Sequence, residues 1–264
     1  MEPMQINDME FQIVQKLLFK ETGISLADTK MKMVQSRLDK RLRFHNITSY
    51  SNYLKIVQIS QTEKTEFINE LSTNETYFFR ESKHFEFLEN IAKTRNSLRV
   101  WSAAASMGAE AYSIAMVLDT CIPNSNQWKV LGTDINTATL DIAKKGLYPL
   151  SWSEKIVTKY QKKYCLRGSN KHRDKMLIDM GGDKNITFHE NNLLEENKEI
   201  GFFDVIFLRN VLLYFTEETK LKVINNVLNN LEIGGYLIIS LTEHFDDKKI
   251  ENIKYLHNAI YQKV

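Results

Sequence analysis

Residues 98–118, LRVWSAAASMGAEAYSIAMVL, constrain the fold more than any other stretch of this chain. The apolar run Leu98–Trp101 is typical of a buried strand, a turn of small residues follows at 103–108, and an apolar helical pattern begins near Ala109. In an α/β sheet this order presents backbone N–H groups and a helix N-terminus to a ligand at the carboxyl end of the strand. The same order also suits an ordinary strand-to-helix connection without a ligand, so the rest of the chain must distinguish the two.

Strands and helices alternate after residue 98, which predicts a mostly parallel sheet with helices on both faces. We expect further strands at 128–134, 186–188, 203–208 and 236–241, with helices ending at Gly146 and covering 220–231. Residues 148–185 interrupt this alternation and contain the turn signals Gly168 and Gly181–Gly182. For this interval we expect a short helix followed by a small antiparallel β insertion.

The region before residue 98 shows only helical patterns. Apolar residues at three- and four-residue spacing predict helices over 9–22, 30–45, 49–59 and 63–71. We therefore expect an all-α N-terminal domain over residues 1–88 and an α/β domain over 89–264, with the β subdomain at about 160–190.

The second predicted helix has a basic face. Its cations are Lys30, Lys32, Arg37, Lys40, Arg41 and Arg43, against the single acid Asp39. One interpretation is a solvated face that keeps the protein soluble, and another is a docking surface for an acidic partner. Nucleic acid is a weaker third option, because the net charge of the chain is only +2 and Phe44 is the one interleaved aromatic residue.

Several classes of protein are disfavoured by what the sequence lacks. The two cysteines, Cys121 and Cys165, form no CxxC pair and have no histidine cluster beside them, so we expect no metal site and a reducing compartment. We expect neither a signal peptide nor a membrane-spanning helix, because no apolar run approaches ~18 residues. A cytoplasmic protein is therefore predicted.

Four common site motifs are missing from the sequence: GxGxxG, GxxxxGK[ST], GxSxG and HExxH. Their absence disfavours an ordinary NAD or FAD site, a P-loop, a nucleophile elbow and a zinc site of the HExxH type.

Two residues suggest chemistry on their own. Arg80 lies in an aromatic segment, and a guanidinium matches a carboxylate with two hydrogen bonds. It could instead cap a helix or pair with Glu75 or Glu81. Asp134 ends the second strand, where an acid binds ribose hydroxyls in nucleotide-binding α/β proteins, although strands often end in Asp without such a role.

Taken together, four segments resemble the CheR family, the S-adenosylmethionine-dependent methyltransferases that esterify glutamates of bacterial chemoreceptors. The segments are TNETYFFRE at 73–81, VWSAAASMGAE at 100–110, GTDI at 132–135 and FDVIFLRNVLLYF at 203–215. The runs SRLDKRLR at 36–43 and SLTEHF at 240–245 also fit the family. The resemblance implies an all-α domain followed by a doubly wound, Rossmann-like methyltransferase domain with a small antiparallel β subdomain.

The resemblance also implies site residues, with S-adenosylmethionine as cofactor and S-adenosylhomocysteine as product. Asn74, Thr76 and Arg80 would line the cleft for cofactor and substrate, while Glu110 and Asp134 would hold polar groups of the cofactor. Asn192 and Leu193 would flank the adenine, and Asn210 and Val211 would lie under the cofactor. Arg80 and Tyr214 would be the catalytic residues. Arg37, Lys40, Arg41 and Arg43 would dock the cytoplasmic, acidic helices of the receptor. A monomer is expected, without nucleic acid or membrane insertion.

The chain departs from the family pattern in two places. Ala109 and Ala111 replace an acid and a proline of the usual S-x-G-E-E-P-Y, and residues 176–183 lack the basic residues often found in the β insertion. Loss of the proline weakens only the first helical turn, whereas the missing basic residues leave binding of a receptor tail open. Two other functions therefore remain possible: a cofactor-binding regulatory module that does not methylate, or a methyltransferase for a non-receptor substrate.

Overall fold

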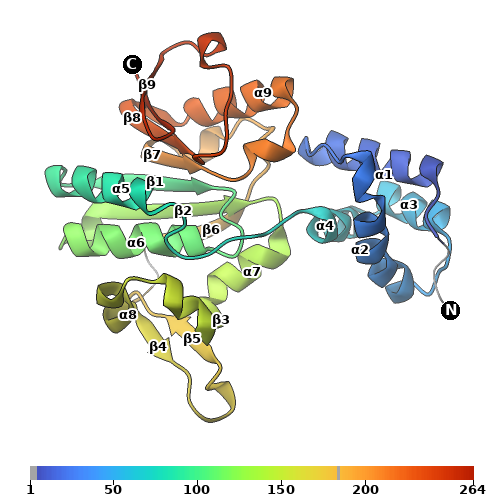
Figure 1. The fold of residues 1–264 in the computed structure, drawn as a ribbon, viewed down its shortest axis with the longest axis horizontal. Coiled ribbons are helices and arrows are strands. Elements are labelled where there is room, and N and C mark those ends of the chain that lie inside the picture. Colours follow the sequence, from blue (N-terminus) through green and yellow to red (C-terminus); the bar gives the residue numbers. More distant parts are fainter. Residues whose placement is uncertain (1–4, 183–184) are drawn as a thin grey trace.

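The structure, a computed structural model, describes residues 5–182 and 185–264. A helical bundle lies beside an α/β domain, and a small antiparallel sheet projects from that domain away from the bundle (Figure 1). An extended segment, residues 72–81, connects the bundle to the α/β domain. None of the described helices is long and apolar enough to cross a membrane.

The bundle consists of the helices predicted from the sequence. They are α1 (Asp8–Thr22), α2 (Met31–Phe44), α3 (Tyr50–Ile59) and α4 (Gln61–Leu71). Their apolar faces form one core that extends from Ile6 to Leu71. Helix α1 begins with a capping box between Asn7 and Glu10 and ends at Gly23, whose φ is +74°. A Cβ at Gly23 would lie 2.9 Å from the Thr219 side chain, so this glycine lets the end of α1 approach the α/β domain closely.

Within the described residues, seven strands form one sheet in the order β6-β2-β1-β7-β8-β10-β9. Their bounds are β1 (Leu98–Ala103), β2 (Trp128–Asp134), β6 (Ile186–Glu190), β7 (Phe203–Leu208), β8 (Leu231–Ile239), β9 (Ile253–His257) and β10 (Ile260–Lys263). The first five strands in this order are parallel, whereas β10 is antiparallel to both neighbours. The chain runs outward from β1 in one direction and from β7 in the other, which places the topological switch point between β1 and β7.

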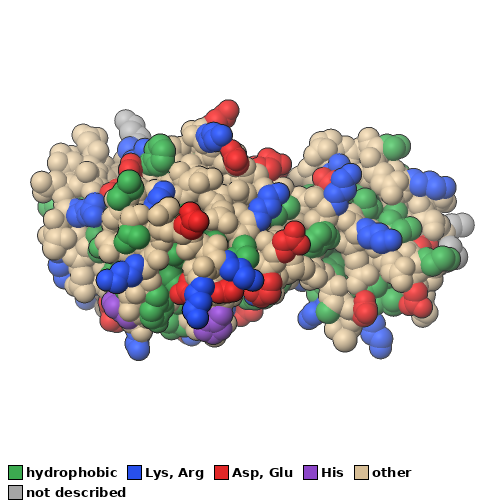
Figure 2. All heavy atoms as spheres, turned by 90° about the horizontal axis from the view of Figure 1, so that it is seen from above, with side chains coloured by type: hydrophobic (Ala, Val, Ile, Leu, Met, Phe, Trp, Pro, Cys, Tyr) green, Lys and Arg blue, Asp and Glu red, His purple; other side chains and the backbone are tan. Residues whose placement is uncertain are grey.

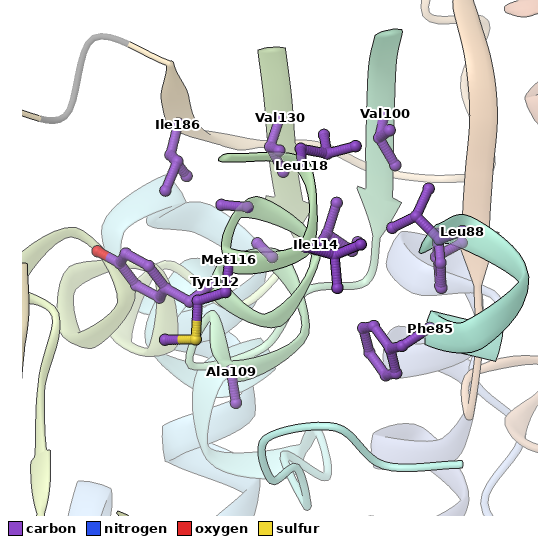
Figure 3. Packing of buried hydrophobic residues seen from close by; sticks show 14 of the residues in the cluster. Phe85, Leu88, Val100, Ala109, Tyr112, Ile114, Met116, Leu118, Val130 and Ile186 are labelled. Carbon is purple, nitrogen blue, oxygen red and sulfur yellow. The ribbon is translucent and has the colours of Figure 1, made fainter. Parts of the chain in front are cut away.

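Helices cover both faces of the sheet, which confirms the predicted doubly wound fold. Helices α5 (Ser82–Thr94), α6 (Ala109–Cys121) and α7 (Thr137–Lys145) contribute to one hydrophobic cluster, and α9 (Glu217–Leu228) contributes to the other. Phe85 and Leu88 of α5 lie next to Ile114 of α6 and Val100 of β1 (Figure 3). Because α5 packs in the α/β core, we propose a domain boundary within 72–81 rather than at the expected residue 88.

The β insertion is present but begins earlier than expected. Strands β3 (Leu147–Pro149), β5 (Lys175–Ile178) and β4 (Cys165–Arg167) form an antiparallel sheet in this order, with α8 (Thr158–Tyr164) preceding β4. The stretch 176–183 lacks basic residues. The structure describes all of it except residue 183. Exposed basic residues lie instead just before it, at Arg167, Lys171 and Arg173.

Two boundaries near the C-terminus differ from the prediction. Strand β8 begins at Leu231, and Gly234–Gly235 lies inside it rather than in a turn before it. A Cβ at Gly235 would lie 2.8 Å from the Glu232 carbonyl oxygen, so only glycine fits this irregular pairing with β7. The hairpin β9–β10 was not predicted.

Candidate active site

A cleft opens at the carboxyl ends of the parallel strands, next to the switch point. Its empty volume is about 930 Å³, a figure that includes space open to solvent. Every residue predicted to bind the cofactor or to act in catalysis lines this cleft: Asn74, Thr76, Arg80, Glu110, Asp134, Asn192, Leu193, Asn210, Val211 and Tyr214. Thr22 and Ile24, at the end of α1, also line it. The roles of these residues stay predictions, but five separate segments bring them together.

Asp134 holds the small-residue loop that follows β1. Its carboxylate accepts hydrogen bonds from the backbone N–H of Ser106 at 2.7 Å and of Asn136 at 2.8 Å. Burial raises the pKa of Asp134, and these backbone hydrogen bonds oppose that shift. Because each carboxylate oxygen has two lone pairs, both oxygens can also accept a hydrogen bond from a ribose hydroxyl.

The same loop approaches its neighbours so closely that it requires glycine. Gly108 has a φ of +84°, and a Cβ there would lie 2.7 Å from the Ala143 side chain. Ala104 and Ser106 also adopt positive φ values, of 67° and 50°. The backbone therefore folds into a compact shape that L-residues rarely adopt, and Asp134 and α7 support it.

Glu110 faces an arginine that the sequence analysis missed. Arg209 donates to Glu110 at 2.8 Å and to Glu81 at 3.0 Å, and only 4% of Arg209 is exposed. Ser102 Oγ donates to the other oxygen of Glu110 at 2.7 Å. One guanidinium thus balances two carboxylates and leaves a net negative charge beside the cleft. A charged residue directly after the apolar strand β7 was the signal that could have revealed Arg209.

The two carboxylates respond differently to this environment. Burial raises the pKa of Glu110 and outweighs the attraction of Arg209. Burial would also raise the pKa of Glu81, but the Ser240 hydrogen bond and the Arg209 charge together hold it below the usual value. Glu81 is therefore the more firmly ionised of the pair.

Arg80 lies in a strained turn in the segment that connects the two domains. Phe79 and Glu81, on either side of it, have φ values of 54° and 59°. The Arg80 guanidinium donates to the Glu75 carbonyl oxygen at 3.2 Å and lies 5.6 Å from the centre of the Tyr77 ring. Glu81 pairs with Arg209 rather than with Arg80. The Arg80 side chain therefore lines the cleft without an ion pair among the described residues.

The aromatic residues of this segment anchor it to the α/β domain. Phe79 stacks on Tyr160 with ring centres 5.1 Å apart, and Phe78 packs edge-to-face on Tyr148. The backbone N–H of Phe79 also donates to Ser113 Oγ at 3.0 Å. The packing of these rings fixes the turn that carries Arg80.

Tyr214 lies in the loop that follows β7, and the carboxylate of Glu243 holds this loop through hydrogen bonds. The Glu243 carboxylate accepts hydrogen bonds from the backbone N–H of Asn210 at 2.9 Å and of Leu213 at 3.3 Å. Asn210 has a φ of 59°, and its side-chain amide donates to Ser240 Oγ at 2.9 Å. The carbonyl oxygen of Tyr214 accepts a hydrogen bond from Ser25 N–H at 2.8 Å, which joins this loop to the N-terminal domain.

The predicted adenine side of the cleft also joins the two domains. Asn192 Nδ2 donates to the Glu21 carbonyl oxygen, near the end of α1, at 2.8 Å. Leu193 is 8% exposed and contributes an apolar surface. Asn191, which the sequence analysis did not select, lines the cleft next to them.

The four predicted docking residues of α2 fall into two pairs. Arg37 donates to the carbonyl oxygens of Glu70, Leu71 and Ser72 at the end of α4, and Arg41 forms an ion pair with Glu63 at 2.6 Å. The Lys40 side chain is 66% exposed, and Arg43 is also exposed. Arg37 and Arg41 therefore hold the bundle together, and only Lys40 and Arg43 face solvent. On the face that Figure 2 shows, positive side chains are scattered among acidic ones and do not form a continuous basic patch.

The fold and the cleft define a doubly wound α/β protein that binds a nucleotide-like cofactor at its switch point. Comparison with protein families identifies the family. The profile "CheR methyltransferase, SAM binding domain" matches residues 74–259, and "CheR methyltransferase, all-alpha domain" matches residues 9–72. The chain therefore belongs to the CheR family and is an S-adenosylmethionine-dependent methyltransferase.

Curated relatives agree with this assignment over most of the chain. The chemotaxis protein methyltransferase of Escherichia coli is 36% identical over 249 residues, which cover 92% of this chain and 87% of that protein. Chemotaxis protein methyltransferase 2 of Pseudomonas aeruginosa is 36% identical over 242 residues, covering 89% and 86%. The chemotaxis protein methyltransferase of Borreliella burgdorferi is 35% identical over 268 residues, covering 94% and 92%.

Proposed function

We propose that this enzyme transfers the methyl group of S-adenosylmethionine to glutamate side chains on the cytoplasmic helices of chemoreceptors and forms glutamyl methyl esters. One observation carries the proposal: Arg80 and Tyr214, from distant segments, line the same cleft as the residues expected to bind the cofactor. The names of the curated relatives support chemotaxis as the setting. We further propose that the protein acts as a monomer in the cytoplasm and does not bind nucleic acid.

The residues of the cleft fit the cofactor. When bound, S-adenosylmethionine supplies a methyl group made electrophilic by a sulfonium, and it carries an ammonium as well. The net negative charge of Glu81, Arg209 and Glu110 suits these cationic groups. Asp134 would accept hydrogen bonds from the ribose hydroxyls, and Leu193 would contact the adenine.

Arg80 and Tyr214 would prepare the acceptor. A glutamate with a pKa near ~4.3 is already ionised at neutral pH, so transfer needs no general base. Arg80 would bind one carboxylate oxygen and leave the other free to form the new O–CH₃ bond as the S–CH₃ bond breaks. The main task of the protein is therefore alignment at a near-attack distance of ~3–3.5 Å, with Tyr214 shaping the methyl pocket.

The departures at Ala109 and Ala111 give little support to a non-catalytic module. Both side chains are fully buried in α6, and Glu110 between them still reaches the cleft. Each alanine therefore fills the hydrophobic core rather than replacing a residue that faces the cofactor.

Methyl transfer from labelled S-adenosylmethionine to cytoplasmic receptor fragments tests the proposal. We expect label that is released as methanol by base, which is diagnostic of a glutamyl ester. Cofactor binding without any labelling of receptor would favour the regulatory module. Labelling of another protein or a small molecule instead would favour the non-receptor methyltransferase.

A further inference from the structure

The residue directly after β8 lies between the two loops that carry Arg80 and Tyr214. Ile239, the last residue of β8, pairs with Leu208, the last residue of β7, so Ser240 lies beside the start of the loop after β7. Its side chain is completely buried. A buried hydroxyl needs hydrogen-bond partners, and the identity of these partners defines what it does.

Ser240 Oγ connects the two loops directly. It donates to Glu81 Oε1 at 2.6 Å and accepts from Asn210 Nδ2 at 2.9 Å. The directions are fixed by chemistry, because an ionised carboxylate only accepts and an amide NH₂ only donates. Glu81 follows Arg80 in the first loop, and Asn210 begins the loop that leads to Tyr214.

Both partners of Ser240 need such support. Glu81 and Asn210 each have a φ of 59°, a left-handed conformation that residues other than glycine seldom adopt. The same backbone strain therefore occurs on both sides of one hydroxyl. Without that hydroxyl, the two loops would lose one direct connection, and Arg209, which donates to Glu81 and to the Arg80 carbonyl oxygen, would remain as another.

The turn that contains Ser240 keeps other hydrogen bonds when this hydroxyl is removed, although the hydroxyl also lies 3.2 Å from Thr242 Oγ1 and accepts from the Thr242 N–H at 3.4 Å. The backbone N–H of Ser240 donates to Glu243 Oε2 at 3.1 Å, and Glu243 also binds the backbone N–H of Asn210. Arg209 still holds Glu81 through a separate ion pair. A Ser240→Ala variant should therefore fold, with the connection between the loops weakened.

We propose that Ser240 is a positioning residue, whose hydroxyl holds the Arg80 loop and the Tyr214 loop in register so that the methyl acceptor is aligned. The inference rests on the proposed function, because it concerns the acceptor that Arg80 and Tyr214 orient. Ser240 itself acts only through Glu81 and Asn210.

Kinetics of the full-length Ser240→Ala enzyme with receptor fragments test this role. We expect kcat to fall by about 10–100-fold, the effect of a misplacement near 1 Å, while the cofactor Kd changes less than about twofold. Ser240→Thr keeps the hydroxyl and should restore most of the activity. If Ser240→Ala does not fold, Ser240→Cys can replace it, because a thiol fills similar space and is a weaker hydrogen-bond donor. We expect the same fall in kcat and the same nearly unchanged cofactor Kd for this variant.

Ser102→Ala is the matched control on the other side of the cleft. Ser102 is also completely buried and also donates to a carboxylate, that of Glu110. The Ser102→Ala variant should raise the cofactor Kd and leave kcat nearly unchanged. Equal effects of Ser240→Ala and Ser102→Ala on kcat and on Kd would overturn the proposal.

A double-mutant cycle between Ser240 and Tyr214, with kcat as the measured quantity, distinguishes a positioning role of Ser240 from a merely structural one. If Ser240 acts through the loops, Tyr214→Phe should cost clearly less kcat in the Ser240→Ala background than in the wild type. Additive losses would contradict the proposal.

Hydrogen exchange distinguishes failure of this inference from failure of the proposed function. Backbone amides of 77–81 and 209–214 should exchange faster in Ser240→Ala than in the wild type, whatever the substrate is. A wild-type enzyme that does not methylate receptors, together with this faster exchange, would reject the function and keep the loop connection. Unchanged exchange in both loops would reject the connection.

Discussion

The two halves of the cleft are held in different ways. On the cofactor half, a compact loop after β1 is fixed by backbone hydrogen bonds to Asp134 and by the close approach of Gly108 to α7. On the acceptor half, Arg80 and Tyr214 lie on two separate loops that depend on the side chains of Arg209, Ser240 and Glu243. The loop on the cofactor half is thus held by one βαβ unit and the helix that follows it, whereas the two loops of the acceptor half are held by side chains from distant parts of the chain.

From the difference between the two halves of the cleft, we expect Asp134→Ala to have the largest effect on cofactor affinity. It removes the acceptor of two backbone N–H groups as well as the predicted ribose ligand, so we expect the cofactor Kd to rise more than about 100-fold and stability to fall by about 2 kcal/mol. Calorimetry and denaturant unfolding measure the two changes. Glu190, the exposed acid that ends the neighbouring strand, is the control, and Glu190→Ala should change neither quantity. Wild-type cofactor affinity in Asp134→Ala would contradict this view of the cofactor half.

Arg80→Ala should affect the acceptor half alone. We expect kcat to fall by about 100-fold with a much smaller change in cofactor Kd, because the guanidinium would bind the acceptor carboxylate. Arg80→Lys should recover only part of the activity, since an ammonium cannot form the same two-pronged contact. If cofactor binding is lost and turnover per bound complex is unchanged, Arg80 belongs to the cofactor half.

Arg41 and Lys40 test whether basic residues of α2 support the bundle or face a partner. Arg41→Ala removes the guanidinium that donates to both oxygens of the buried Glu63, and we expect stability to fall by about 2–3 kcal/mol. Lys40→Ala should stay within about 0.5 kcal/mol of the wild type. Urea unfolding of both variants measures the difference, and equal stabilities would show that the Arg41 pair contributes nothing.

Charge reversal at Lys40 and Arg43 tests docking. The double variant to Glu should raise KM for receptor fragments by about 5–10-fold at low salt, and the difference should shrink as salt screens the attraction. Cofactor Kd and thermal stability should not change. An unchanged KM at low salt would remove α2 from the docking surface.

The smallest expected effect is a pH dependence of cofactor binding. Because burial raises the pKa of Glu110, this carboxylate gains its proton at a higher pH than the ordinary value of 4.5. Protonation removes negative charge from the cofactor half, so the cofactor Kd should increase as the pH falls through that raised pKa. Titration calorimetry across this range measures the change. Glu110→Gln should have a weaker affinity that no longer varies over the range, and an unchanged pH profile in this variant would assign the dependence to another group.

The same contrast explains what the sequence could predict. The strand at 128–134 and the helices of the bundle agree with the structure closely, because local periodicity and caps determine them. Helix α5 was missed because its first residue follows Glu81 in a left-handed conformation without a side-chain cap. Strands β9 and β10 are short and partly polar, so their pattern is weak. Arg209 has partners 128 and 99 residues away in the chain, a distance over which periodicity carries no information.

The contact between the end of α1 and the cleft has a thermodynamic consequence. Thr22 and Ile24 line the cleft, and Asn192 and Tyr214 of the α/β domain bond to the backbone of residues 21–25. A cofactor molecule in the cleft would touch both domains at once. By linkage, docking of the bundle must then tighten cofactor binding by the same factor by which the cofactor tightens docking of the bundle. If Lys40 and Arg43 dock a receptor as predicted, cofactor occupancy would thereby affect how firmly α2 is held against that receptor.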